Sequence, residues 1–464
     1  MPVADAQGFR ARVADTALAD LLDDIWAIQC ADVARVAALC DDAVRRAVVR
    51  ADGVGVFWAR LSRLLLTHRC GQPDALSVDD LDAAHALSPN VVGDPRAQRL
   101  LAVADGAMLI CLGQHEQALD HFRAMPLGST ADADDPDDYF VLRGIAHAAS
   151  RLQRLDLLFD ALYANAFLSE RTGSPLRVAV ASTELAAALV EIGRFADALD
   201  LLEPRLRGGA LRFANPLLVG HLRIHVAVAR FGLGRAVEAS NEFRALVADG
   251  TVDVSRGFAF QVHANLMGVC LQRGLHDEAL ASALLAQECA TRMRRKAPLG
   301  LALQGAGLIA HARGDIDEAI RLLERSLACF ESDKPFITPM TGQADAGTVL
   351  SECHAARGRA ELAYTTHRRF FEVHRLRAEF ASRGHLAMLQ ARQNVAARIR
   401  LSERELECLS WSAAGKTAWE TGKILDLSEW TVVYHLQKAK RKFGLTRKQE
   451  VIAHAMSLGL IKPH

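Results

Sequence analysis

The 464-residue sequence lacks the short motifs that mark most enzymes and membrane proteins. It contains no Cys-x-x-Cys, no His-Glu-x-x-His and no Gly-x-Ser-x-Gly, so it offers no recognisable metal site or activated serine. It also has no uncharged apolar run of 18 residues and no apolar stretch at its amino-terminal end, the marks of a membrane span and a secretory signal. We therefore expect a cytoplasmic protein that is not an enzyme, needs no cofactor or metal, and has no membrane partner.

Charge and cysteine usage add two constraints. The nine cysteines are scattered singly, which is typical of small buried side chains in a reducing compartment. The 55 basic and 55 acidic residues balance overall, but residues 391–464 hold 13 Lys and Arg against 7 Asp and Glu, and the rest of the chain holds 42 against 48. Basic charge is thus concentrated near the carboxyl-terminal end, where we expect an anionic partner.

The sequence Gly415-Lys416-Thr417 matches the end of a phosphate-binding loop only superficially. A Walker A loop needs a glycine five residues before Gly415, and that position is Ser410. The preceding segment follows a Ser402-x-x-Glu405 capping box and has apolar residues at helical spacing, whereas the loop must follow a strand. We expect Gly415 to end one helix and Thr417 to cap the next.

Most of the chain is a repeated pattern. The pattern Gly-x-x-x-x-Ala recurs with steps of 80, 41, 40, 40 and 44 residues, starting at glycines 113, 193, 234, 274, 314 and 358. The step of 80 equals two periods, and its midpoint is Gln153. Each copy has an apolar helical stretch before the glycine and an amphipathic one after it, which predicts helical hairpins whose small alanine permits close packing. The fold class expected is all-α, beginning with an α-solenoid.

These repeats resemble the tetratricopeptide repeat, with apolar residues four positions beyond the alanine at Phe122, Leu202 and Leu323. Their period of about 40 residues is similar to that in the sensor domains of maltose-regulator-like transcription factors. The resemblance implies a concave surface that senses an unidentified small molecule, peptide or protein. We predict a sensor or interaction domain over 1–365, a long connecting helix over 366–400, and a small helical domain over 401–464.

The carboxyl-terminal domain is expected to contain four helices, near 403–413, 418–425, 429–442 and 447–458. Capping boxes beginning at Ser402, Thr417 and Thr446 fix three helix starts. The second and third helices form a helix-turn-helix. In the third, Val432, Leu436, Ala439 and Phe443 are spaced to pack inward.

Residues 401–461 closely resemble the LuxR/NarL-type (GerE) DNA-binding domain, through Ser402-x-Arg404-Glu405, Trp411, Gly415-Lys416-Thr417, Thr431-Val432 and Gly459-Leu460-Ile461. The resemblance implies a bacterial transcriptional regulator that binds double-stranded DNA as a homodimer. Base contacts are expected from Val433, Tyr434 and Gln437. Phosphate contacts are expected from Lys416, Thr417, Trp430, Thr431, Lys438, Arg441 and Lys442, and dimer contacts from Val451 and Ala455.

Two departures from the family pattern leave a second hypothesis open. Trp430 and Val433 stand where the family often has cations, so base reading could be altered or lost. Val433 suits a thymine methyl group, and Gln437 suits adenine. The alternative is an adaptor or anti-activator that binds other regulators through its repeats and binds DNA weakly or without sequence preference.

Overall fold

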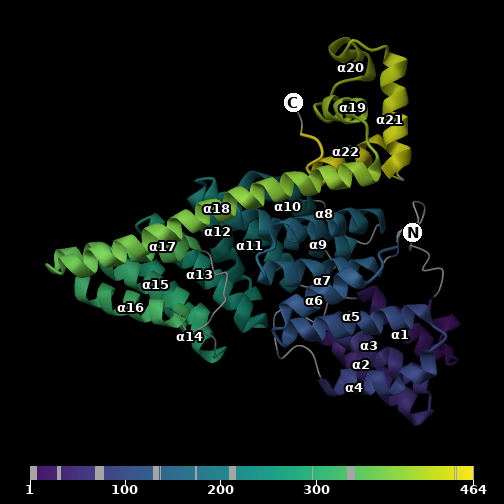
Figure 1. Ribbon diagram of the computed structural model, residues 1–464, viewed down its shortest axis with the longest axis horizontal. Coiled ribbons are helices and arrows are strands. Elements are labelled where there is room, and N and C mark those ends of the chain that lie inside the picture. The colour runs from purple at the N-terminus through teal and green to yellow at the C-terminus, as the bar shows by residue number, and fades with distance from the viewer. Residues whose placement is uncertain are drawn as a thin grey trace. The chain divides into compact units, whose positions relative to one another are not determined.

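The computed structural model describes residues 8–28, 33–67, 78–128, 135, 137–172, 175–207, 216–294, 296–331, 340–443, 445 and 447–462. Within these ranges the regular secondary structure is helical and contains no strand (Figure 1). The predicted all-α fold class is confirmed. Among the helices of the same ranges, none combines the length and the apolar character needed to cross a membrane.

The first helices precede the predicted repeats. Their bounds are η1 (Phe9–Ala11), α1 (Thr16–Ile28), α2 (Val33–Val49), α3 (Gly53–Thr67), α4 (Val78–Leu87) and η4 (Ser88–Val91). The repeats follow as hairpins: α5 (Pro95–Cys111) with α6 (His115–Ala124), α7 (Asp138–Arg151) with α8 (Leu155–Thr172), α9 (Pro175–Glu191) with α10 (Phe195–Arg207), α11 (Pro216–Gly232) with α12 (Ala236–Ala248), then after η5 (Thr251–Val254) α13 (Arg256–Gln272) with α14 (His276–Arg292), α15 (Lys296–Ala312) with α16 (Ile316–Glu331), and α17 (Met340–Ala356) with α18 (Ala360–Ile399).

The repeat glycines sit in the turns of these hairpins, as predicted. All six have φ between +70° and +85°, the left-handed region that side chains with a Cβ rarely adopt. Gln153 occupies the same turn between α7 and α8 with φ of 56°, so the midpoint of the 80-residue step is a true repeat position. The α-solenoid of helical hairpins is therefore confirmed.

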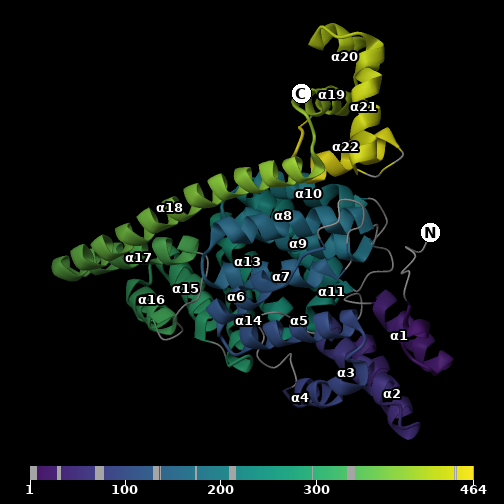
Figure 2. The ribbon, with the colours of Figure 1, turned by 45° about the vertical axis from the view of Figure 1, so that its right-hand side comes forward.

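Small residues set the spacing inside each hairpin. The repeat alanines on α6, α10, α12, α14 and α16 are fully buried, and Phe122, Leu202 and Leu323 are buried beside them. α15 and α16 lie side by side in both views (Figures 1 and 2). The Cβ-free surface of Gly307 makes this approach possible, because an added Cβ would lie 2.8 Å from Leu323.

Ion pairs join successive repeats at a fixed register. The arginine just before one repeat glycine pairs with the aspartate three residues after the previous one: Arg313 with Asp277 at 2.5 Å, and Arg357 with Asp317 at 2.8 Å. These aspartates are exposed, so solvent screens each pair and it contributes little to stability. Their repetition nevertheless shows that neighbouring hairpins stack in the same way.

By contacts, the chain forms two compact units. One comprises Met1–Ala181, Ala210–Asn215 and Ala387–His464, and the other comprises Ser182–Gly209 and Pro216–Leu386. The carboxyl-terminal helices thus share a unit with the first helices of the chain. The sequence-based domain boundaries at 365 and 400 stay a prediction.

The predicted connecting helix is α18, a single helix of 40 residues. Phe370 and Phe380 are buried on its packed edge, whereas Leu376 is about half exposed. α18 continues without a break through Gly384. This glycine gives room for Ile192 of the α9–α10 turn, because a Cβ would lie 2.4 Å from that side chain.

Candidate DNA-binding module

The last four helices form a small module, labelled α19–α22 in Figure 2. Their bounds are α19 (Glu403–Ala413), α20 (Ala418–Leu425), α21 (Glu429–Phe443) and α22 (Lys448–Ser457). Each lies within one residue of its predicted range. α19 and α21 pack together, and α22 contacts both.

Two of the three predicted capping boxes are present. The Ser402 and Thr417 hydroxyls accept hydrogen bonds from the backbone of Glu405 and Glu420, at 3.3 and 3.2 Å. The two carboxylates accept from the backbone N–H of Ser402 and Thr417, both at 2.8 Å. Hydrogen bonds from Thr417 hold the pKa of Glu420 below its usual range. The third box begins at Thr446, which lies outside the described residues.

The Gly-Lys-Thr sequence is therefore a helix junction. Gly415 follows α19 with φ of +81°, and Thr417 is the N-cap of α20. The Lys416 ammonium lies 3.8 Å from the carboxylate of Glu420, the residue that completes the capping box, and both side chains are exposed. The local order of helix, glycine and N-cap agrees with the prediction and leaves no strand-to-helix loop for a nucleotide.

A tight turn joins α20 to α21 and gives the helix-turn-helix. Asp426 adopts a left-handed conformation with φ of 55°, and the Leu427 N–H donates to the Gly422 carbonyl at 2.8 Å. Gly422 is required here because a Cβ would come within 2.6 Å of the Leu427 carbonyl oxygen. The Ser428 hydroxyl then accepts from the Thr431 N–H at 3.0 Å and starts α21.

α21 has one buried and one exposed face. The predicted inward residues are all at most 7% exposed: Val432, Leu436, Ala439 and Phe443. The opposite face, which we call the crest, consists of exposed residues at positions i, i+4, i+7 and i+11: Trp430, Tyr434, Gln437 and Arg441. Val433 and Lys438 are exposed on either side of the crest. All three predicted base-contacting residues thus lie on one accessible surface.

Trp430, one of the predicted phosphate-contacting residues, lies on the crest. Its ring stacks on that of Tyr434, with centroids 6.0 Å apart and an interplanar angle of 14°. The Lys438 ammonium is 5.7 Å from the Tyr434 ring centroid, within cation–π range. The tryptophan remains 76% exposed.

Lys442 is placed differently from the other predicted cations. Its ammonium donates to the Glu405 carboxylate at 2.6 Å and to the Arg400 carbonyl oxygen, and its side chain is only 22% exposed. Glu405 itself is fully buried. Lys442 therefore ties the start of α19 to the end of α21, whereas Lys438 and Arg441 are exposed beside the crest.

The two residues assigned to dimerisation lie in the interior. Val451 and Ala455 have no exposed surface in the single chain. The exposed residues of α22 are spaced four and three apart and form a separate stripe: Gln449, Ala453 and Met456. The sequence pattern does not separate the two cases, because Val451 and Ala455 suit an apolar contact equally well inside a small core and between two chains.

Helix α8 meets the carboxyl-terminal part of the chain through one stripe of side chains. The Tyr163 hydroxyl accepts a hydrogen bond from Arg392 at 2.8 Å. The Asp160 carboxylate accepts one from Asn394 at 3.0 Å. Both partners are on α18. The stripe follows helical spacing of i, i+3, i+7 and i+10: Asp160, Tyr163, Phe167 and Glu170.

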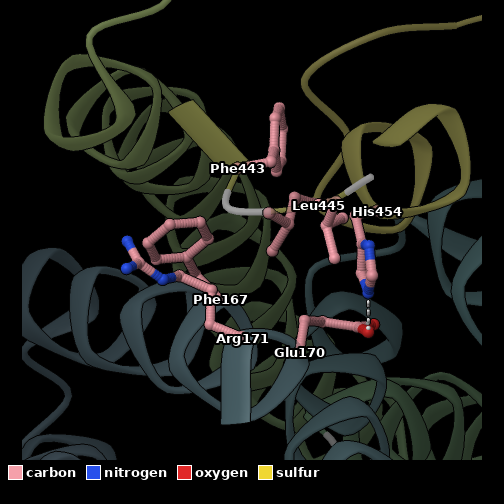
Figure 3. A pocket seen from close by; sticks show the side chains of 7 residues that line it. Phe167, Glu170, Arg171, Phe443, Leu445 and His454 are labelled. Carbon is pink, nitrogen blue, oxygen red and sulfur yellow. Dashed lines mark ion pairs between the residues drawn. The ribbon is translucent and has the colours of Figure 1, made fainter. Parts of the chain in front are cut away.

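The far end of this stripe contacts the module itself (Figure 3). His454 of α22 points at Glu170, with Nε2 2.6 Å from a carboxylate oxygen. Both side chains are less than 20% exposed. The crevice around this pair is lined by Phe167, Glu170 and Arg171 of α8 and by Phe443, Leu445, His454 and Leu458 of the module. We call the α8 stripe and its partners the mount.

The mount has only a weak signature in the sequence. Acidic and aromatic residues share one face of α8. Packing between the repeats requires only apolar residues there, so the acidic residues are the signal. Their partners lie more than 220 positions further along the chain, so the pairing itself had no local signature. Within the described ranges, no cluster of three or more His, Cys, Asp or Glu side chains is arranged to hold a metal ion. Burial raises the pKa of the Cys408 thiol to about 11, so it stays protonated.

Comparison with known proteins agrees with this geometry for the module. Residues 400–455 match the family described as bacterial regulatory proteins, luxR family. The chain is 48% identical over 65 residues to the quorum sensing-dependent transcriptional regulator RpaR of Rhodopseudomonas palustris, and 46% identical over 61 residues to VjbR of Brucella abortus. These matches cover 14% and 13% of this chain, and 27% and 24% of those proteins. The chain thus spans about a quarter of each relative's length.

Solved structures resemble the repeats. A Rap protein complexed with Competence and Sporulation Factor matches with a TM-score of 0.53 and 14% identity, over 79% of this chain and all of that one. The apo form of RapI matches with a TM-score of 0.51 and 11% identity, over 77% and 98%. At such identities the likeness concerns the fold alone. The molecule therefore combines a helical-repeat solenoid with a LuxR-type helix-turn-helix domain.

Proposed function

We propose that this protein is a DNA-binding transcriptional regulator whose repeat array senses a ligand and whose module binds an operator as a homodimer. One observation carries the proposal: in a LuxR-type module, α21 turns its whole crest to solvent, with Lys438 and Arg441 exposed alongside. A helix with polar and apolar groups on its outer face and cations beside them is suited to the major groove.

The crest assigns separate tasks to its side chains. The Gln437 amide can form a bidentate pair with one adenine, in which its N–H donates to N7 and its C=O accepts from the N6 amino group. This pair of contacts distinguishes adenine from the other bases. Val433 offers an apolar contact. Lys416, Thr417, Thr431, Lys438 and Arg441 remain the proposed phosphate contacts. We leave Lys442 out because its ammonium is held by Glu405 and Arg400.

We place the dimer contact on the exposed stripe of α22, at Gln449, Ala453 and Met456, instead of on Val451 and Ala455. Burial of the latter two inside one chain supports this change. Two modules related by a two-fold axis would bind half-sites about one helical turn, roughly 10 bp, apart. In sedimentation experiments with operator DNA, a Met456→Glu variant should then bind as separate monomers, and its binding to the two half-sites should no longer be cooperative.

The repeat array is proposed to bind a peptide, protein or small molecule. Stacked helical hairpins create an extended concave surface suited to such ligands, and the Rap protein of similar fold was solved with Competence and Sporulation Factor bound. Native mass spectrometry of the protein exposed to cell extract should reveal a bound mass that alters operator affinity. A ligand that binds without changing that affinity would argue against a sensor.

The central test is a genome-fragment binding selection with the full chain at physiological salt. We expect a two-fold symmetric motif, and Gln437→Ala should relax preference at one base pair of each half-site. Gln393→Ala, at an exposed position of α18, is the matched control and should leave the motif unchanged. Salt-sensitive binding with no enriched motif would overturn the proposal and favour the adaptor that binds other regulators.

A further inference from the structure

The crest carries an exposed aromatic pair that the contacts proposed so far do not use. Trp430 is 76% exposed and Tyr434 is 43% exposed, although large aromatic side chains are usually well buried. The two rings are held parallel on successive turns of α21. Stacking fixes both rings before any partner arrives, so little side-chain entropy remains to be lost on binding.

The position of the pair restricts what can cover it. Trp430 and Tyr434 share the crest with Gln437 and Arg441, directly opposite the buried face. The Lys438 ammonium lies over the Tyr434 ring of the pair, so a cation borders the apolar surface. A cationic border disfavours a purely apolar protein partner and suits an anionic one. Among anionic partners, the double helix also presents apolar groups in its major groove.

Those apolar groups are the C5-methyl groups of thymine, since every other major-groove edge presents hydrogen-bond donors and acceptors. We infer that Trp430 and Tyr434, with Val433 beside them, read thymine methyl groups, so that thymines lie opposite the first half of α21 in the operator. This inference rests on the proposed function and specifies its DNA. It also replaces the expected phosphate contact of Trp430 with a base contact.

The test removes the methyl group and keeps the base pair. In the operator obtained by selection, the thymines facing the first half of α21 are replaced with deoxyuridine. Wild-type affinity should fall about fourfold for each methyl group removed, the loss expected for one buried carbon. Trp430→Ala should weaken binding to the thymine operator and make the remaining affinity nearly independent of the thymine-to-uracil change.

Two controls separate reading from general binding. Trp419→Ala removes another exposed tryptophan, 58% exposed on α20, and should leave the thymine-to-uracil ratio as in wild type. Deoxyuridine placed outside the half-sites should have no effect. Thermal unfolding of each variant checks that the module remains folded. We expect this because the side chains of Trp430 and Trp419 are both mainly exposed.

The outcomes distinguish this inference from the proposed function. A specific operator that binds equally well with uracil, or has no thymine at these positions, overturns thymine reading and leaves the regulator intact. Equal weakening of both operators by Trp430→Ala also overturns it, because the ring would then contact the sugar-phosphate backbone. Failure of the selection to yield any motif removes the proposed function itself.

Discussion

Two surfaces of the same module differ in how far their side chains are exposed to solvent. On the α21 crest, Trp430 is 76% exposed and Tyr434 is 43% exposed. On the mount, the His454 and Glu170 side chains are 19% and 13% exposed and pair with each other. Helix α8 thus contacts α22 and the end of α18, whereas the crest of α21 is exposed to solvent.

The difference predicts two kinds of mutational effect. Crest side chains make few contacts within the chain, so changing them should alter DNA binding with little effect on folding. Residues of the core and the mount should show the reverse, because their contacts are all internal. The following changes test this division, beginning with the largest expected effect.

Phe443→Ala should destabilise the module most. Phe443 is 3% exposed, belongs to the buried face of α21 and also lines the crevice of the mount. Loss of a buried phenyl ring costs roughly 3–5 kcal/mol. Urea unfolding followed by circular dichroism should show this loss, whereas Trp430→Ala should remain within about 0.5 kcal/mol of wild type. Similar losses for both variants would remove the distinction between the two faces of α21.

Glu405→Ala should have the next largest effect. The buried carboxylate caps α19 and also binds Lys442, so its removal leaves a partly buried ammonium without its partner. We expect a loss of roughly 2–3 kcal/mol. Thr417→Ala, which removes only the exposed cap of α20, should cost about 1 kcal/mol by the same unfolding measurement. Equal losses would show that Lys442 contributes nothing at this site.

Thr421→Val should stabilise the module. Thr421 is fully buried, with a hydroxyl that makes no hydrogen bond. Valine has nearly the same shape and removes the unsatisfied group, so stability should rise by about 1 kcal/mol. A higher unfolding midpoint with unchanged operator affinity would support this, and a lower midpoint would show that the hydroxyl has a partner.

Glu170→Gln should produce the smallest change in stability but a localised one. Losing the ion pair with His454 should cost less than about 1 kcal/mol because both groups retain some solvent. Hydrogen exchange should increase around the end of α22 and stay unchanged in α21. Asp156→Asn, at an exposed position on the same helix, is the control. Increased exchange throughout the module would contradict a local effect of the Glu170–His454 pair on α22.

Much of the fold could be predicted because its causes are local. A left-handed turn selects glycine, so the repeat glycines revealed the hairpins, and capping boxes gave the starts of α19 and α20 within one residue. The inward face of α21 followed from helical spacing. The burial of Val451 and Ala455 inside the module could not be predicted in this way, because an apolar position on α22 has the same sequence pattern whether its contact is inside the module or in a second chain.

The sequence by itself determined the all-α class, the repeats, the four helices of the module and the composition of the α21 crest, since each depends on neighbours within a few turns of helix. Only the tertiary structure decided that Lys442 binds Glu405, that Val451 and Ala455 are interior, and that α8 holds α18 and α22. These depend on pairings between residues tens to hundreds of positions apart. Such pairings are set by how whole helices pack, and no local periodicity encodes them.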